Sequence, residues 1–326
     1  MASYAGSSYK TKLEIDRLLK EKEDSDAPKE EDREYKYPKC VVFIIGNEFC
    51  ERFTYYGTRA VLSLYLVGWL NYTESDATLV FHVFSMLCYF FPFIGAIIAD
   101  SCLGRFKTIF YLSVVYVAGN ATVSAASSPV LGASYPRLFS LLGLLLIAIG
   151  TGGIKPCVSA FGGDQFVLPQ QTIQLATFFS VFYASINAGS LLSTIITPIL
   201  RHDVHCFGME TCFPLAFGVP GILIVIALLL FLAGRPLYTC KEPRGNIVVR
   251  VIKVISHALV MKCRSKEKIH WLDYADDKFD KTLIAHTKAA LQVLVLFIPL
   301  PMFWSLFDQQ GSRWTFQATH MEGSLG

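Results

Sequence analysis

Charge is scarce in this sequence. Charged residues make up 17% of the 326 residues, whereas hydrophobic residues make up 53% and the mean hydropathy is +0.44. Soluble domains carry about a quarter charged residues, so this deficit argues against soluble domains and against a disordered chain. The net charge of +3 is also too small for the basic balance of a nucleic-acid-binding protein. An integral membrane protein is the class that remains once these are excluded.

The sequence also lacks the common signatures of catalysis. It contains no serine nucleophile elbow and no zinc-type spacing of cysteine and histidine. Gly150–Lys155 superficially suggests a phosphate loop, but it lacks the Walker spacing and lies in an apolar segment. We interpret its glycines as sites of close helix approach or bending. An enzyme is therefore disfavoured, and neither a cofactor nor a metal is expected.

Seven apolar segments are long enough, or nearly so, to cross a bilayer as helices. One of them is split by charged residues into Cys40–Asn47 and Ala60–Tyr72. We predict an all-α membrane protein, because a helix satisfies its own backbone hydrogen bonds in lipid. The six uninterrupted segments are Ala77–Ala99, Thr108–Pro136, Leu138–Ile154, Leu175–Leu200, Phe213–Gly234 and Ala289–Phe307.

The distribution of charge predicts the domain organisation. Residues 1–38 are rich in charges of both signs and lack a signal-peptide pattern, which indicates a disordered cytosolic tail. Residues 39–238 should form a six-helix bundle, 239–282 a linker, and 283–326 a seventh helix together with the residues after it. Most of the 29 lysines and arginines fall in the tail, the 104–108 turn and the linker. The positive-inside rule places these three segments in the cytosol.

Two features of the opposite side fit this orientation. Asn71-Tyr72-Thr73 is an N-glycosylation sequon and would lie outside. Cys206 and Cys212 are the only two of the nine cysteines in an outside loop. They could form a disulfide in an oxidising compartment, and the alternative is two free thiols.

Apolar and basic side chains alternate within residues 247–254 of the linker. This pattern fits an amphipathic helix that lies on the inner leaflet. The alternative is a helix that only packs within the linker, and we expect a mixture of the two.

The first apolar segment contains several ionisable residues. Glu48, Arg52 and Arg59 recur at helical spacing, with Tyr55-Tyr56 between them and Glu51 beside them. Ionisable residues inside a membrane are costly, so this stripe predicts a functional site. The alternative is a buried ion-pair cluster that only fixes helix packing.

Polar side chains on other segments suggest that the stripe faces a shared, water-filled cavity. Each has an individual alternative: His82 could be a core histidine, Asn187 an interhelical hydrogen bond, and Trp304 an interfacial anchor. The residues concerned are His82, Tyr89, Lys155, Tyr183, Asn187, Trp304, Asp308, Gln309 and Gln310.

Several motifs resemble the proton-coupled oligopeptide transporters of the major facilitator superfamily. Glu48-x-x-Glu51-Arg52-Phe53-x-Tyr55-Tyr56-Gly57 looks like the family hallmark, and Gly95–Lys107 resembles the signature loop of the superfamily. Further matching blocks are 161–166, 187–190 and 303–314. The resemblance extends from about Tyr37 to the last residue and is greatest to animal di- and tripeptide transporters of the intestinal and renal type.

The resemblance implies a twelve-helix fold built from two six-helix bundles. This chain would hold the first bundle and the seventh helix, as a fragment, a truncated isoform or an incomplete gene model. The implied activity is proton-driven import of di- and tripeptides by alternating access, at a plasma membrane. One alternative keeps the fold and carries histidine or another small solute. Another is a non-transporting fragment that dimerises with, or regulates, a complete transporter.

The resemblance also implies roles for individual residues. Glu48, Glu51, His82 and Lys155 would take part in proton coupling. Arg52 and Lys155 would attract the peptide carboxylate, and we expect Lys155 to reach the charged stripe. Asp100 and Arg105 would belong to the gating structure. The residues implied to bind or position the peptide are Arg52, Tyr56, Arg59, Tyr89, Lys155, Tyr183, Asn187 and Trp304.

Three positions depart from the family pattern. Phe81 stands where a tyrosine is expected, and Thr177 and Gln292 stand where basic residues are expected. These changes bear on transport rate and affinity more than on the family.

Overall fold

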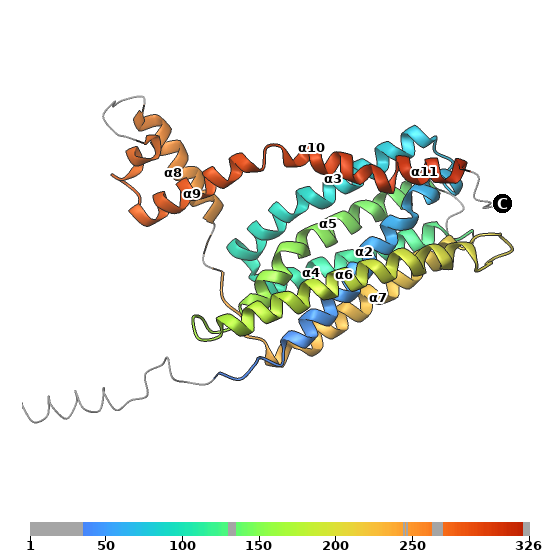
Figure 1. Ribbon diagram of the computed structural model, residues 1–326, viewed down its shortest axis with the longest axis horizontal. Helices are drawn as coiled ribbons and strands as arrows, with labels where there is room; N and C mark the ends of the chain where they lie inside the picture. The colour runs from blue at the N-terminus through green and yellow to red at the C-terminus, as the bar shows by residue number, and fades with distance from the viewer. Residues whose placement is uncertain (1–34, 130–134, 244, 246, 263–269, 322–326) are drawn as a thin grey trace, which may run out of the picture.

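The computed structural model describes residues 35–129, 135–243, 245, 247–262 and 270–321. Residues 1–34 of the predicted cytosolic tail lie outside these ranges. Helices dominate the described part, and the long ones run side by side (Figure 1). The helices are α2 (Val41–Gly68), α3 (Glu74–Ile98), η2 (Ala99–Leu103), α4 (Arg105–Ala126), α5 (Pro136–Gly163), α6 (Thr172–His202), α7 (Phe213–Ala233), η3 (Arg235–Leu237), α8 (Ile247–Lys262), η4 (Trp271–Ala275), α9 (Lys281–Leu296), α10 (Leu300–Phe307), η5 (Asp308–Gly311) and α11 (Arg313–His320).

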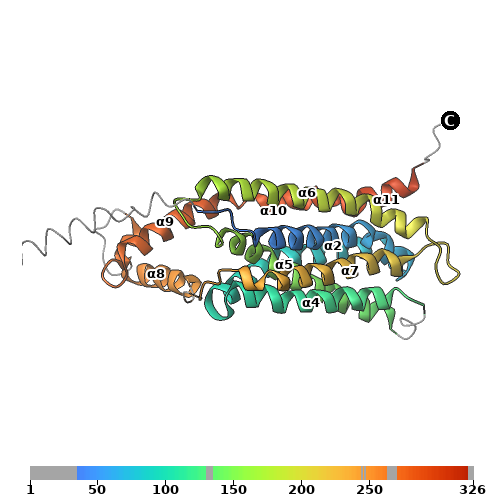
Figure 2. The ribbon, with the colours of Figure 1, turned by 90° about the horizontal axis from the view of Figure 1, so that it is seen from below.

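Helix α2 lies inside the bundle. It packs against α6 and α7, while α5 packs against α3 and α4. Figure 2 shows α2 between α6 and α4. We call the two ends of the bundle the Val41 end, where α2 begins, and the Gly68 end, where it finishes. Helices α8 and α9 lie beyond the Val41 end, and α10 and α11 run beside α3 (Figure 1).

Five helices are long and apolar enough to cross a membrane. A sixth is added if α9 and the stretch from α10 to α11 are counted as one span with a 44° bend. Helix α2 is also long, at 28 residues, but its charged residues keep it out of this set. The five helices are Glu74–Leu103, Arg105–Ala126, Pro136–Gly163, Thr172–His202 and Phe213–Leu237.

Two predicted segments were wrong in their extent. The helix expected over Thr108–Pro136 ends at Ala126, since Pro129 disfavours helical geometry at the residue before it. The apolar run Ala289–Phe307 does not form one straight helix, because α9 ends at Leu296 and the chain bends before α10. Pro299 lies at this bend and has no N–H group to continue the hydrogen-bond ladder.

Short polar structures join the helices at the Gly68 end. Asn71 is exposed and has a positive φ of 51°, and Thr73 caps α3 by accepting a hydrogen bond from the Asp76 N–H. Between α6 and α7, a disulfide joins Cys206 to Cys212. Glycosylation of Asn71 stays a prediction.

The structure confirms that the glycines of α5 are sites of close helix approach. A Cβ atom added at Gly150 would overlap Tyr116 of α4, and one added at Gly152 would come within 2.8 Å of the Phe91 Cβ on α3. A Cβ atom added at Gly95 of α3 would overlap the backbone of Gly153. Backbone contact of this kind replaces the hydrophobic effect as a source of helix association in lipid.

Gly95→Ala should destabilise the bundle by about 1–3 kcal/mol, because a backbone cannot move aside as a side chain can. Gly221→Ala is the matched control, since its new Cβ would lie 3.6 Å from the Asn120 Cβ, an ordinary contact. Thermal unfolding in nanodiscs measures both changes. Equal melting temperatures for the two variants would contradict the assignment of a tight α3–α5 contact.

Candidate functional site

Three buried charges lie together on α2. Glu48, Glu51 and Arg52 are each at most 5% exposed. The Arg52 Nε atom lies 3.1 Å from Glu48 Oε1, one helical turn away, and the Arg52 guanidinium also forms an ion pair with Glu51. The cluster thus has two carboxylates for one guanidinium. It can accept a proton on a carboxylate and still keep its cation paired.

Neighbouring helices enclose this cluster. The Thr151 hydroxyl of α5 donates a hydrogen bond of 2.6 Å to Glu51 Oε1. On α6, a Cβ atom added at Gly189 would lie 2.8 Å from the Phe49 carbonyl oxygen and 3.3 Å from the Arg52 Cβ. The sequence analysis missed Thr151, although a hydroxyl between glycines in an apolar segment was a usable signal.

Lys155 does not join the cluster through an ion pair. Among the described residues it has no carboxylate partner within 4.0 Å, but it is close enough to interact electrostatically with Glu48, Glu51 and Arg52. Its ammonium group instead lies 5.0 Å from the ring centre of Tyr89. The Tyr89 ring in turn packs against Trp304 of α10, with ring centres 6.1 Å apart. The structure therefore brings these three predicted residues together beside the cluster.

A second ion pair joins α2 to η5 near the Gly68 end. Arg59 Nη2 lies 2.5 Å from Asp308 Oδ1, and Asp308 is buried. The guanidinium also lies over the ring of Phe81, 5.2 Å from its centre. The sequence analysis named both charges but missed their pairing. The high cost of an unpaired charge in a membrane segment was the signal that could have joined them.

His82 contacts the same region. Its Nε2 atom lies 3.3 Å from the Gln309 side-chain nitrogen and 3.3 Å from the Ser312 hydroxyl. The Ser63 hydroxyl donates to the Gly311 carbonyl at 2.5 Å. His82 is thus no purely apolar core histidine, and it helps to hold η5 against the first bundle.

The predicted residues of α6 are placed differently. Tyr183 and Asn187 are both exposed, and the Asn187 side chain donates within α6 to the Tyr183 carbonyl at 3.0 Å. On α2, the predicted residue Tyr56 is half-buried and packs edge-on against Tyr55. Gly189, two residues beyond Asn187, is the point at which α6 touches the buried cluster.

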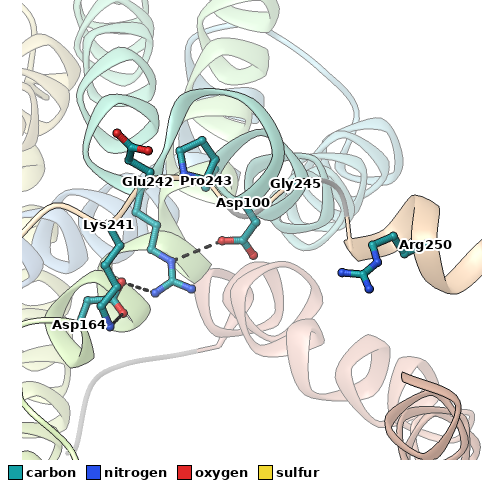
Figure 3. A pocket seen from close by; sticks show the side chains of 9 residues that line it. Asp100, Asp164, Lys241, Glu242, Pro243, Gly245 and Arg250 are labelled. Carbon is teal, nitrogen blue, oxygen red and sulfur yellow. Dashed lines mark hydrogen bonds and ion pairs between the residues drawn. The ribbon is translucent and has the colours of Figure 1, made fainter. Parts of the chain in front are cut away.

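A separate charge network lies at the Val41 end (Figure 3). Arg105 Nε lies 3.4 Å from Asp100 Oδ1, and the Arg105 guanidinium also pairs with Asp164 at the end of α5. Lys241 Nζ, in the segment after α7, lies 2.9 Å from Asp164 Oδ1. The network borders a cavity of about 350 Å³, which Glu242 and Arg250 also line.

Gln165, the residue after Asp164, also binds the segment that follows α7. The Thr239 N–H donates to the Gln165 side-chain oxygen at 2.8 Å, and the Gln165 amide donates back to the Thr239 carbonyl at 3.2 Å. Asp164 and Gln165 therefore hold the start of α4 and the segment after α7 together. The sequence analysis predicted Asp100 and Arg105 here but missed Lys241 and Thr239, which are far away in sequence.

Comparison with known proteins decides the family. A family model described as the POT family matches residues 106–326. The chain belongs to the POT family. It is 56% identical to peptide transporter family 1 of Drosophila melanogaster over 292 residues, and 56% identical to solute carrier family 15 member 2 of Rattus norvegicus over 297 residues. These alignments cover 89% of this chain but 39% and 40% of the relatives.

The solved structures agree with the fold. The crystal structure of the POT family transporter PepTSo is 30% identical, with a TM-score of 0.70 over 89% of this chain and 64% of that one. A second crystal structure, of a proton dependent oligopeptide family transporter, is 32% identical with a TM-score of 0.67, covering 87% and 66%.

These comparisons make the chain a multi-pass membrane protein of the major facilitator type, in a family of transporters and not of enzymes. It spans about two fifths of the length of the curated relatives that it matches.

Arg52→Leu should destabilise the POT-family chain by about 3–5 kcal/mol, because two buried carboxylates would lose their cation. Arg313→Leu removes an exposed arginine from α11 and serves as the control. Thermal unfolding of both variants at one pH tests this. A similar small change in both would show that the α2 cluster does not depend on its guanidinium.

Proposed function

We propose that the complete protein is a proton-coupled symporter that imports di- and tripeptides across a plasma membrane, with the Val41 end in the cytosol. The observation that carries this proposal is the buried cluster of α2, which has one more carboxylate than cation. Family membership and the names of the relatives support peptides as the substrate class. Protons are the coupling ion, and no cofactor is required.

Binding and protonation are linked through Arg52. A peptide carboxylate needs a cation, and Arg52 is already paired with Glu48 and Glu51. Protonation of one glutamate releases part of the guanidinium for the peptide. Lys155, which has an aromatic partner and no carboxylate partner among the described residues, is a second cation for the same group. Two ligands at coupled sites strengthen each other's binding by the same factor.

His82 links protonation to the Gly68 end. Its Nε2 atom can accept a hydrogen bond from the Gln309 amide only while that nitrogen is unprotonated. Proton uptake there ends the hydrogen bond from the Gln309 amide and leaves the Ser312 hydroxyl, which can accept, as the partner of Nε2. Arg59–Asp308, Ser63–Gly311 and His320–Glu74 are among the contacts that must then break for this end to open.

One large surface of the chain requires a partner for transport. The side chains from Val293 to Leu306, on α9, α10 and the bend between them, include many that are about half exposed or more, such as Leu296, Ile298 and Met302. A peptide cavity needs walls on both sides, and the alignments cover about two fifths of the relatives. We therefore propose that the second six-helix bundle of the family completes the cavity.

The 326-residue chain alone should transport no dipeptide. Joined to the remaining part of the Drosophila relative, it should show acid-stimulated uptake in proteoliposomes with an imposed proton gradient. Labelled dipeptide and free histidine are compared as substrates. Uptake of histidine alone would replace the peptide proposal, and inactivity of the joined chain, although correctly folded, would favour a regulatory fragment.

In the joined protein, Glu51→Gln should reduce gradient-driven accumulation at least about ten-fold, the factor that 1.4 kcal/mol of coupling represents. Peptide exchange without a gradient should persist, with a weaker dependence on pH, because glutamine imitates the protonated carboxylate. Glu242→Gln, at an exposed carboxylate, is the control. Normal accumulation by Glu51→Gln would assign the cluster to packing alone.

His82→Ala should likewise lose accumulation while it retains folding and membrane insertion. Histidine is the side chain whose ordinary titration range matches a membrane proton gradient. Uptake is measured against external pH, with His205→Ala, in the outer connection between α6 and α7, as the control. An unchanged pH profile in His82→Ala would leave His82 with a structural role only.

A further inference from the structure

Helix α8 has one face that is packed within the linker. Val254 and Ala258 are fully buried against Leu272 of η4 and Ile284 of α9. His257 adds an interaction with Asp277, at 2.9 Å from Oδ1. These contacts fix which side of α8 faces the rest of the protein.

The opposite face of α8 is exposed and largely aliphatic, with the exposed Ser256 among its aliphatic side chains. A helix turns by about 100° per residue, and this rotation places five aliphatic side chains on the face opposite Val254 and Ala258. Their exposed fractions range from 39% to 55%. They are Val248, Val249, Ile252, Leu259 and Val260.

Cations border this aliphatic face on both sides. Lys253 lies along one edge and Lys262 along the other, and Arg250 follows Lys253. All three are exposed, and none forms an ion pair within 4.0 Å among the described residues. Helix α8 contains no acidic residue.

We propose that this face of α8 binds the lipid surface next to the Val41 end, with Lys253 and Lys262 on anionic headgroups. An apolar stripe between lysines suits the boundary of a bilayer, where aliphatic groups enter the acyl region and ammonium groups extend to the phosphates. The linker places α8 near the bilayer, because α8 packs on η4 and α9, and α9 is the first half of the bent pair that can count as a sixth span.

The charges favour lipid over a protein partner. A cationic border is complementary to the anionic inner leaflet, which attracts basic side chains next to the membrane. The cavity beside Asp100 and Asp164 is a weaker anion site, because carboxylates line it together with cations. The proposal goes beyond peptide transport and remains testable if the transport proposal fails.

The test places a benzophenone amino acid at position 259 of the 326-residue chain, in nanodiscs of phosphatidylcholine and phosphatidylserine at a ratio of about 3 to 1. After illumination, mass spectrometry identifies the adducts. Phosphatidylserine adducts should exceed the mixing ratio about five-fold or more, because the two lysines attract the anionic headgroup. High salt should remove the excess.

Paired variants separate local from overall charge. Lys253→Gln with Lys262→Gln should return the adducts to the mixing ratio. Lys278→Gln with Lys281→Gln removes the same charge from exposed positions outside α8 and should leave the excess in place. Three results would each overturn the proposal: adducts at the mixing ratio in the benzophenone chain that keeps Lys253 and Lys262, an equal loss in both double variants, or adducts to protein instead of lipid.

Discussion

The ion pairs of Arg52 with Glu48 and Glu51 determine where α2 can lie. These charges cannot face lipid, since each would be several kcal/mol more costly there than in a protein interior with a partner. Helix α2 must therefore occupy the inside of the bundle, and the apolar helices must surround it. The contacts of α2 with α6 and α7, and of Thr151 with Glu51, follow from this requirement.

The sequence was sufficient for most of the fold because its main determinant is local. A run such as Phe213–Leu237 forms an apolar helix whatever its neighbours do. The same reasoning failed at Ala289–Phe307, where hydropathy could not show the bend near Pro299. It also overextended the helix that ends at Ala126, because apolar composition continues where helical geometry does not.

The candidate site was predictable as a set of residues but not as a set of contacts. Helical spacing placed Glu48 and Arg52 on one face, which the 3.1 Å ion pair bears out. Spacing could not pair Arg59 with Asp308, since 249 positions separate them in the chain. It also could not show that Lys155 lies over Tyr89, because the direction of a long side chain depends on tertiary packing.

The attachment of Lys241 and Thr239 to Asp164 and Gln165 has a consequence for biosynthesis. Asp164 and Lys241 are 77 positions apart, so translation at about 5–20 residues per second delivers the lysine about 4–15 s after the aspartate. During that interval the end of α5 can hold Arg105 but not the segment after α7. The contacts of Lys241 and Thr239 with the end of α5 thus form only after all of α2 to α7 has been synthesised.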